Sequence, residues 1–543
     1  MQSAFGSRLM HRAGSALCLL ALLAGCAPRT AATSTRLAFI SPAVSAAPAP
    51  AASPLAQLRD DVLSATRMTG VRRAVWGIAV HSLDRDERLV EQNAGVLLVP
   101  ASAAKIISVA SAAEAVGWNH QFVTELRAAG PIVSLPQPPG APASGGDEPL
   151  NRVLQGDLVV VGSGDPSIGG RAGDSLTVFV DAVKVAGIRR IEGRIVGDDD
   201  RLEEPRPQLA WAWDDLGYTS GAIFGALNLA ENRMVVTVTP ATAAGAAAAL
   251  AVEPHAAARP LINRTVTGAR GSTPLLWPEQ RPGETALSIA GSLPLGAAPV
   301  RMNVAVGNPT LWFAAVLRHA LLQAGIEVTG DAVDADDLDQ RPDTTAAPVV
   351  FTYRSHTFAE IAQPLLKESI NLYAEAALRL NAAPGALPTN DAALAGLRAR
   401  LDGWGIAADG DQIIDGSGLS RRNVVSAETL LAVLRRMHDP TGLSPFMTGL
   451  PVAGVDGSLA TRMRGTAAQG NVRAKTGSMS NIRSLAGYAI TRDGEHLAFV
   501  LMVNNFEGPG ADAHRALDAI AVRLASFSRS ATVPPPASRP GSP

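Results

Sequence analysis

The sequence predicts an α+β fold in which one antiparallel sheet, flanked by helices, is built from both ends of the folded chain and is interrupted by a long inserted region. Three observations predict this fold. Two strand pairs, each joined by a short polar turn, lie near opposite ends of the sequence. Apolar helical patterns accompany both pairs, and a long middle region carries strand and turn signals of its own. With 543 residues, 47% of them hydrophobic, the chain can form several domains.

The N-terminal half of the sheet is predicted from the region that begins at Pro54. Pro54–Thr66 has a helical pattern, and Ala74–Val80 is an apolar strand. A polar turn at Asp84–Glu87 and a second strand follow, so this part is expected to form a hairpin. Ala101–Gly117 is rich in Ala, Ile and Val without internal Gly or Pro, which predicts a largely buried helix with Ser102 in its first turn.

The C-terminal half of the sheet has the same kind of signals. Ser484–Thr491 and His496–Val503 flank Asp493-Gly494, a strong signal for a hairpin. The next segment, 511–526, has apolar residues at the spacing of an amphipathic helix. We therefore expect the two hairpins to share one sheet, in a domain made of residues 55–120 and 350–527.

The region between these halves, residues 121–349, is predicted to be an insert. Pro240–Pro260 within it is alanine-rich and of low complexity, a composition that forms a core poorly. We expect residues 121–235 and 290–349 to form one domain. Residues 236–289 are a candidate small subdomain.

The two ends of the chain predict export and flexible tails. Residues 1–25 have the basic start and apolar run of a secretory signal peptide, and Leu23-Ala24-Gly25-Cys26 resembles the lipobox of bacterial lipoproteins. We expect lipidation of Cys26 and attachment to a membrane through this anchor, in the periplasm; an ordinary cleaved signal is the alternative. Residues 26–54 and 528–543 are rich in small and polar residues and Pro, which predicts a flexible linker and a disordered tail.

Composition argues against several classes of function. The formal net charge is −2 and charges of both signs are mixed along the chain, so nucleic acid is not expected as a partner. Removal of the signal peptide and lipidation of Cys26 would leave no cysteine for a disulfide or a metal site. The histidines lack metal-ligand spacing, and Asp198-Asp199-Asp200 is interpreted as a solvated turn. We expect no metal and no cofactor.

Lysine is scarce in this chain, and its positions are informative. Among 47 Lys and Arg residues, the lysines are Lys105, Lys184, Lys367 and Lys475. Arginine supplies surface charge but is effectively never deprotonated, so a lysine in such a background is a candidate for chemistry. Three of the four lie in or beside short motifs: Ser102-Ala103-Ala104-Lys105, Ser369-Ile370-Asn371 and Lys475-Thr476-Gly477.

The first motif can activate a hydroxyl group. Ser102 and Lys105 are three residues apart, and such positions lie on the same face of a helix. A lysine side chain ordinarily has a pKa of about 10.4, so Lys105 can accept the hydroxyl proton only if burial or a second cation lowers its pKa. We expect the apolar helix to bury Lys105 and Lys475 to be the second cation. Arginine could not replace lysine at position 105.

In this order, the three motifs resemble those of the penicillin-recognising serine enzymes. The long separation between Ser102 and Ser369 is similar to that in the D-alanyl-D-alanine carboxypeptidase/endopeptidase family, the low-molecular-mass penicillin-binding proteins with a large inserted region. Gly162–Pro166, Asp415–Ser420 and Ala453–Gly457 also resemble stretches of that family. The resemblance runs from about residue 55 to 525 and implies a β-lactamase/transpeptidase-like domain.

The resemblance implies roles for the catalytic residues. Ser102 would be the acylated nucleophile and Lys105 its general base. Ser369 would relay a proton towards the leaving group, and Asn371 would orient Lys105 and the substrate. Together with Lys475, these residues would form the catalytic set and carry out covalent catalysis through an acyl-enzyme.

The third motif would bind the substrate. Lys475 and Thr476 would hold its terminal carboxylate, and Gly477 would allow a substrate strand to lie close to the sheet. The backbone N–H groups of Ser102 and Ser478 would form the oxyanion hole.

The predicted function is that of a serine DD-peptidase. It would hydrolyse D-Ala-D-Ala ends or D-Ala cross-links of peptidoglycan peptides, and β-lactams would inhibit it. A β-lactamase or esterase on the same motifs is one alternative, and a non-catalytic, cell-wall-binding lipoprotein is another. The sequence leaves open the balance of carboxypeptidase and endopeptidase action and the oligomeric state.

Overall fold

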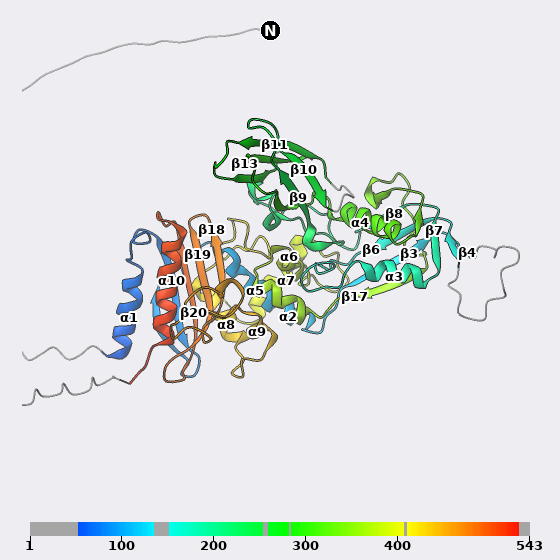
Figure 1. Cartoon of the computed structure of the whole chain (residues 1–543). Coiled ribbons are helices and arrows are strands. Elements are labelled where there is room, and N and C mark those ends of the chain that lie inside the picture. The colour runs from blue at the N-terminus through cyan, green and yellow to red at the C-terminus, as the bar shows by residue number, and fades with distance from the viewer. Residues whose placement is uncertain (1–52, 135–150, 254–258, 282–283, 407–409, 531–543) are drawn as a thin grey trace, which may run out of the picture. The chain divides into compact units, whose positions relative to one another are not determined.

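The computed structural model describes residues 53–134, 151–253, 259–281, 284–406 and 410–530 (Figure 1). The predicted signal peptide, Cys26, nearly all of the predicted linker and most of the predicted tail lie outside these residues. Within the described part of the chain, no helix has the length and apolar character needed to cross a membrane.

The predicted antiparallel sheet is present, and strands from both ends of the chain build it. Its order is β18-β19-β20-β1-β2, with every neighbouring pair antiparallel. The strands are β18 (Arg473–Met479), β19 (Ile482–Ile490), β20 (His496–Asn504), β1 (Val75–Ser82) and β2 (Glu87–Gln92). Both predicted hairpins are confirmed, because β1 pairs with β2 and β19 pairs with β20.

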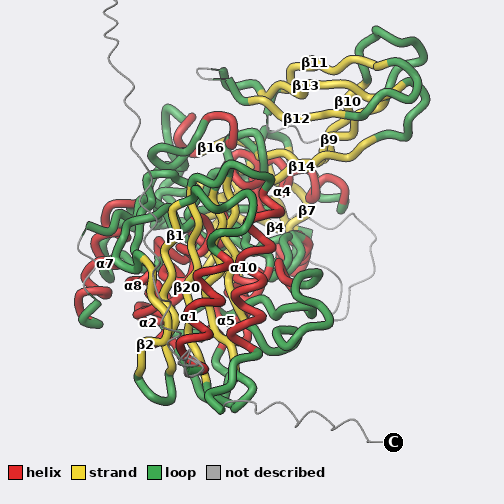
Figure 2. Tube along the Cα trace, turned by 90° about the vertical axis from the view of Figure 1, so that its left-hand side faces the viewer, coloured by secondary structure: helices red, strands yellow, loops and turns green. Residues whose placement is uncertain are grey.

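Side-chain alternation along the central strand β20 gives this sheet two buried faces. Leu497, Phe499 and Leu501 belong to one apolar cluster with residues of α1 (Pro54–Ala65) and α10 (Gly510–Ala525). Figures 1 and 2 show these two helices side by side along the sheet. Ala498 and Val500 point the other way, into a second cluster under the remaining helices of this part. Those helices are α2 (Lys105–Val116), α5 (Phe358–Lys367), α6 (Asn371–Arg379), α7 (Asn390–Gly403), α8 (Ala427–Met437) and α9 (Pro445–Gly449).

The helix predicted over residues 101–117 begins with a tighter turn. Ala101–Ala104 forms a 3-10 turn that contains Ser102, and α2 starts at Lys105. Ala101 has φ of 48°, a conformation that an alanine seldom adopts, so the surrounding structure must hold it. The turn therefore presents Ser102 at the start of a helix that is buried along most of its length.

The middle of the chain forms two mixed sheets with two helices. One sheet has the order β16-β8-β6-β3-β17 and the other β15-β7-β5-β4. The first contains β16 (Ala332–Asp334), β8 (Ile195–Asp198), β6 (Asp157–Val161), β3 (Val123–Ala129) and β17 (Val349–Arg354). The second contains β15 (Glu327–Val328), β7 (Ile188–Ile191), β5 (Arg152–Leu154) and β4 (Ile132–Ser134). The helices α3 (Thr177–Val185) and α4 (Pro309–Gln323) share their apolar core.

Two three-stranded sheets complete the insert, with the orders β10-β9-β14 and β11-β13-β12. Their strands are β9 (Arg233–Thr239), β10 (Ala249–Glu253), β14 (Val300–Ala305), β11 (Leu261–Gly268), β12 (Leu275–Glu279) and β13 (Leu287–Pro294). The alanine-rich stretch contains β10, and the side chains of Leu250 and Val252 on this strand pack against the apolar core. The paired strands of this part extend from Arg233 to Ala305.

Candidate active site

Ser102 and Lys105 lie where the sequence predicts, and their side chains touch. The Nζ atom of Lys105 is 2.8 Å from Oγ of Ser102, and Lys105 is fully buried. The turn that carries Ser102 is attached to the sheet at two points. Asn504 hydrogen-bonds both the N–H and the C=O of Val99, at 2.9 and 3.1 Å, and Oγ of Ser484 donates to the carbonyl of Pro100 at 2.7 Å. The sheet thus fixes the position of the candidate nucleophile.

Two further oxygen atoms surround the Lys105 amine. Nζ donates to Oδ1 of Asn371 at 2.7 Å and to the backbone carbonyl of Ser417 at 2.7 Å. Burial lowers the pKa of Lys105 to about 7, although the negative charges of Asp415 and Glu375 act in the opposite direction. A lysine in this position is partly neutral near pH 7 and can accept a proton.

A second lysine–serine pair lies on the other side of the site. Nζ of Lys475, on β18, donates to Oγ of Ser369 at 2.8 Å and to the carbonyl of Thr476 at 2.9 Å. Ser369 lies two residues before the start of α6 and has φ of 65°, so its backbone is held in an uncommon conformation. Asn371 is the first residue of α6, which explains why the second motif places both side chains at one helix end.

One electrostatic expectation needs correction. Two causes of a lowered pKa were expected for Lys105, burial on the apolar helix and the positive charge of Lys475. In the structure, burial lowers the pKa of Lys105, and the charges that act on it are negative. Burial also lowers the pKa of Lys475 well below its ordinary value, and the positive charge of Lys105 adds to this effect.

The remaining residues of the third motif lie on β18 beside the nucleophile. Oγ1 of Thr476 and Oγ of Ser458 are 2.7 Å apart. A methyl group at Gly477 would overlap Oγ of Ser484 and would lie 2.6 Å from the Pro100 carbonyl. The glycine is therefore needed for the close packing of β18 against the Ser102 turn. The close approach of a substrate strand at Gly477 stays a prediction.

A cleft of about 450 Å³ lies beside Ser102. Four of the predicted site residues line it: Ser102, Ser369, Asn371 and Ser478. The predicted residues Lys105, Lys475, Thr476 and Gly477 do not line it, and residues that had no predicted role do. Those additional residues are Ala212, Asp214, Asp215, Ser220, Gly418, Leu419, Arg421, Met479 and Ser480. The cleft thus has walls from the sheet, from the Asp415–Ser420 stretch and from a loop of the insert.

Three residues around Lys105 were missed as members of the site: Glu375, Asp415 and Trp211. Asp415 and Glu375 are completely buried, and both accept hydrogen bonds from the backbone that surrounds Ser417. The sequence signalled Asp415 only as part of an Asp-Gly-Ser-Gly turn. Trp211, in the insert, donates from Nε1 to Oδ2 of Asp415 at 2.8 Å, a contact that no local pattern could indicate.

The interpretation of Asp198-Asp199-Asp200 as a solvated turn was wrong for two of its residues. Asp198 and Asp199 are buried, and only Asp200 is exposed. Burial raises the pKa of Asp199 to about 6. The reason is that β8 ends at Asp198, inside the sheet, so the acidic run starts before the chain reaches solvent.

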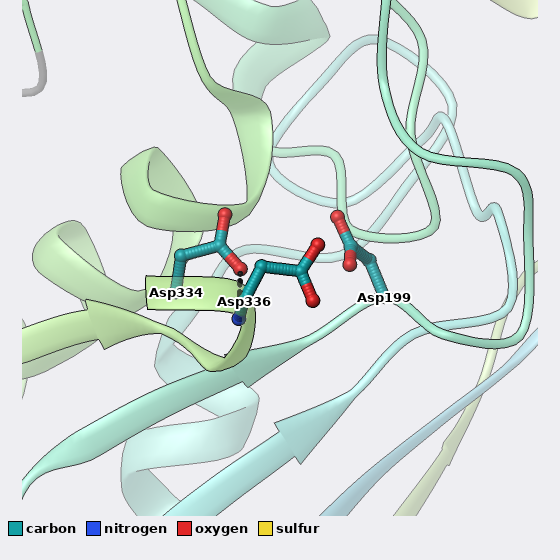
Figure 3. Close-up of side chains that lie close together, drawn as sticks. All are labelled: Asp199, Asp334 and Asp336. Carbon is teal, nitrogen blue, oxygen red and sulfur yellow. Dashed lines mark hydrogen bonds between the residues drawn. The ribbon is translucent and has the colours of Figure 1, made fainter. Parts of the chain in front are cut away.

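Asp199 lies in an acidic cluster with Asp334 and Asp336 (Figure 3). Protein groups already interact with each member of this cluster. Thr310 hydrogen-bonds Asp199, the side-chain amide of Asn308 donates to Asp334 at 2.7 Å, and Arg341 forms an ion pair with Asp336.

The fold and the two lysine–serine pairs define a serine acyl-transfer enzyme of the penicillin-recognising class. The sequence matches the D-Ala-D-Ala carboxypeptidase 3 (S13) family over residues 58–526, and the chain belongs to this family. It is 34% identical to the D-alanyl-D-alanine carboxypeptidase of Actinomadura sp. (strain R39) over 489 residues, which cover 87% of this chain and 85% of the relative. The predicted activity, that of a serine-type D-Ala-D-Ala carboxypeptidase, is confirmed.

Two further comparisons agree with the fold and the family. The D-alanyl-D-alanine carboxypeptidase DacB of Haemophilus influenzae is 24% identical over 79% of this chain and 85% of its own length. The crystal structure of penicillin binding protein 4 (dacB) from the same organism superposes with a TM-score of 0.71 at 23% identity, covering 86% of this chain and 99% of that chain. The predicted β-lactamase/transpeptidase-like fold with an insertion is confirmed.

Proposed function

We propose that Ser102 is the acylated nucleophile of this carboxypeptidase and that Lys105 is its general base. The observation that carries the proposal is the 2.8 Å contact between a serine hydroxyl and a fully buried lysine amine. Neutral Lys105 removes the hydroxyl proton as Oγ attacks the carbonyl carbon of the penultimate D-Ala. The tetrahedral intermediate places negative charge on the former carbonyl oxygen, and the N–H groups of Ser102 and Ser478 bind it.

Ser369, Asn371 and Lys475 complete the proposed machinery. The C–N bond breaks as the leaving D-Ala amine takes a proton from Ser369, which is 2.8 Å from the amine of Lys475. The proton that Lys105 took from Ser102 restores the hydroxyl of Ser369. Water then attacks the acyl carbonyl carbon and gives one proton to neutral Lys105. The bond between Oγ of Ser102 and the acyl group breaks as that proton passes from Lys105 to Oγ, which releases the free acid. Lys475 and Thr476 bind the terminal carboxylate of the substrate, and Asn371 orients Lys105.

The proposed substrates are peptidoglycan peptides with D-Ala-D-Ala ends and the D-Ala cross-links between them. We also propose that β-lactams acylate Ser102. A crystal structure of the Haemophilus influenzae penicillin binding protein 4 in complex with a novel β-lactam supports this. The enzyme would work in the periplasm, exported by the signal peptide at residues 1–25 and attached to a membrane by lipidated Cys26.

We further propose that residues 55–120 and 350–527 form the catalytic domain and that residues 121–349 form the insert. The antiparallel sheet, with strands from both of the outer segments, supports this division. Strand β17 pairs with β3 of the insert, so this strand crosses the proposed boundary at residue 350.

Labelling with a fluorescent penicillin tests the assignment of the nucleophile. We expect the wild-type protein and a Ser111→Ala control to be labelled, and Ser102→Ala to stay unlabelled. Ser111 is a suitable control because it lies on the same helix and its Oγ donates to the carbonyl of Ser108. Label retained by Ser102→Ala would show that another residue is acylated. Mass analysis of products from purified muropeptides would show release of D-Ala, and slow loss of the penicillin label would distinguish a peptidase from a β-lactamase.

A further inference from the structure

A loop of the insert reaches the base of the active site at two points. The side-chain amide of Asn371 donates from Nδ2 to the carbonyl of Ser220 at 2.8 Å. The indole of Trp211 donates from Nε1 to Oδ2 of Asp415 at 2.8 Å. Trp211 and Ser220 both belong to the loop between β8 and β9. The insert therefore contacts the residues that surround Lys105, although the loop and Lys105 are far apart in the sequence.

Each of these contacts helps to position one of the two oxygen atoms that accept hydrogen bonds from Lys105. The contact with Ser220 determines which end of the Asn371 amide faces the lysine. Because Nδ2 is used by the Ser220 carbonyl, Oδ1 is left to accept from Nζ of Lys105, at 2.7 Å. An amide turned the other way would place an N–H group against the amine and another oxygen against the Ser220 carbonyl.

The second oxygen is the Ser417 carbonyl, and Asp415 holds the backbone that carries it. Oδ1 of Asp415 accepts from the N–H of Gly418 at 2.7 Å, and Oδ2 accepts from the N–H of Ser420 at 2.6 Å. Glu375 accepts from the N–H of Ser417 at 2.9 Å. The peptide units on both sides of Ser417 are thereby held by buried carboxylates, and its carbonyl points at Nζ of Lys105.

This arrangement decides where the lone pair of a neutral Lys105 points. A neutral amine has two N–H bonds and one lone pair, whereas an ammonium group has three donors. The Ser417 carbonyl and Oδ1 of Asn371 can only accept, so each takes one N–H bond. The lone pair then faces the third neighbour, the hydroxyl of Ser102, which is the one group of the three that can donate a proton.

We propose that Trp211 and Asp415 are positioning residues for the acylation step, through which the insert orients the amine of Lys105 towards Ser102. The proposal rests on the proposed roles of Ser102 and Lys105. It gives the insert a part in catalysis: the loop of residues 211–220 holds the acceptors, and the acceptors orient the base. General-base catalysis contributes about 10²- to 10⁴-fold to a rate, and part of this contribution depends on orientation.

The test is the acylation of the full-length protein by a fluorescent penicillin under single-turnover conditions, with binding and acylation rate measured separately. Labelling of the wild type and its absence in Ser102→Ala first establish the nucleophile; if this step fails, the proposed function fails with it. In Trp211→Phe the indole donor is lost and an aromatic ring is kept. We expect about a tenfold slower acylation with unchanged penicillin binding. Trp277→Phe, on β12, is the matched control and should acylate at the wild-type rate.

Asp415→Asn separates position from charge. Asp415 and Glu375 both raise the pKa of Lys105, and Lys475 is the other titratable group beside it, with a pKa that burial and the charge of Lys105 lower. Loss of its charge should therefore move the acidic limb of the pH–acylation profile to lower pH, while the plateau falls because the Ser417 carbonyl is less well held. In Trp211→Phe the charge remains, so the plateau should fall without such a move.

These outcomes separate a positioning role from a general loss of stability. Thermal unfolding gives the folded fraction of each variant, and the rates are compared per folded molecule. A folded Trp211→Phe that acylates at the wild-type rate would overturn the proposal, whatever the result for Asp415→Asn. So would a fall in penicillin binding with an unchanged acylation rate.

Discussion

Acylation of Ser102 should depend on pH through the protonation of Lys105. The amine is active only when it is neutral, and burial lowers its pKa from 10.5 to about 7. Below pH 7 the protonated amine has no lone pair, so the rate should fall about tenfold for each pH unit. Above pH 7 the rate should approach a plateau. At pH 5 we therefore expect acylation to be about a hundredfold slower than the plateau.

The size of the effect shows the net contribution of burial and of the opposing charges of Asp415 and Glu375 to the chemistry. At pH 7, an unperturbed lysine would be neutral in about one molecule in three thousand, whereas Lys105 is neutral in about half of the molecules. The difference corresponds to about 5 kcal/mol, at about 1.4 kcal/mol for each pKa unit. The direction follows from burial, which destabilises the charged form of an amine.

The assay is the rate of labelling by a fluorescent penicillin between pH 5 and 9, at concentrations below saturation. Intrinsic fluorescence at each pH provides the control that the protein stays folded. A rate that does not change between pH 5 and 8 would refute the argument that Lys105 is the base. A midpoint above pH 9 would refute the argument that the fold lowers its pKa.

Three other predictions concern the same region. Lys105→Arg should abolish acylation, because a guanidinium group is not deprotonated, while Lys184→Arg on α3 should be labelled like the wild type. Gly418→Ala should lower the free energy of unfolding in urea by about 3 kcal/mol or more, because Gly418 has φ of 79° and a methyl group there would overlap the Ala101 carbonyl. The control is Gly245→Ala, at a residue with φ of 86° and open space around it, which should cost only about 1 kcal/mol. Equal losses in the two variants would contradict the overlap at Gly418. Asn504→Ala should cost about 1–3 kcal/mol in the same assay, because the partly buried N–H and C=O of Val99 would both lose their partner. A loss below about 0.5 kcal/mol would show that these contacts matter little.

Local patterns in the sequence were sufficient for the fold of the chain ends. The turn at Asp493-Gly494 and the apolar strands around it predicted the hairpin of β19 and β20. Such signals act between residues close in the sequence, where turn geometry and side-chain periodicity decide the structure. The start of α2 was the exception, since the 3-10 turn and the uncommon conformation of Ala101 depend on contacts with the distant β18 and β19 strands.

Local patterns in the sequence did not predict which charged groups are buried. The acidic run at Asp198 was expected in solvent because three successive carboxylates usually remain hydrated. Asp198 and Asp199 are nevertheless buried, where Thr310 of α4 meets Asp199. Likewise, the charges that act on Lys105 come from Asp415 and Glu375, which lie on separate parts of the chain. Which charged groups come into contact depends on tertiary packing, so a short stretch of sequence does not predict it.

The sequence by itself determined the chemical groups: a serine three residues before a lysine on an apolar helix, the Ser369-Ile370-Asn371 and Lys475-Thr476-Gly477 motifs, and an antiparallel sheet to carry them. These follow from residue type and short-range periodicity, which act wherever the chain folds. Only the tertiary structure decided how the Lys105 amine is oriented, because its acceptors on Asn371 and Ser417 and the insert loop that contacts Asn371 and Asp415 are separated by long stretches of chain. Hydrogen bonds act over about 3 Å, so they depend on where the folded chain places these atoms.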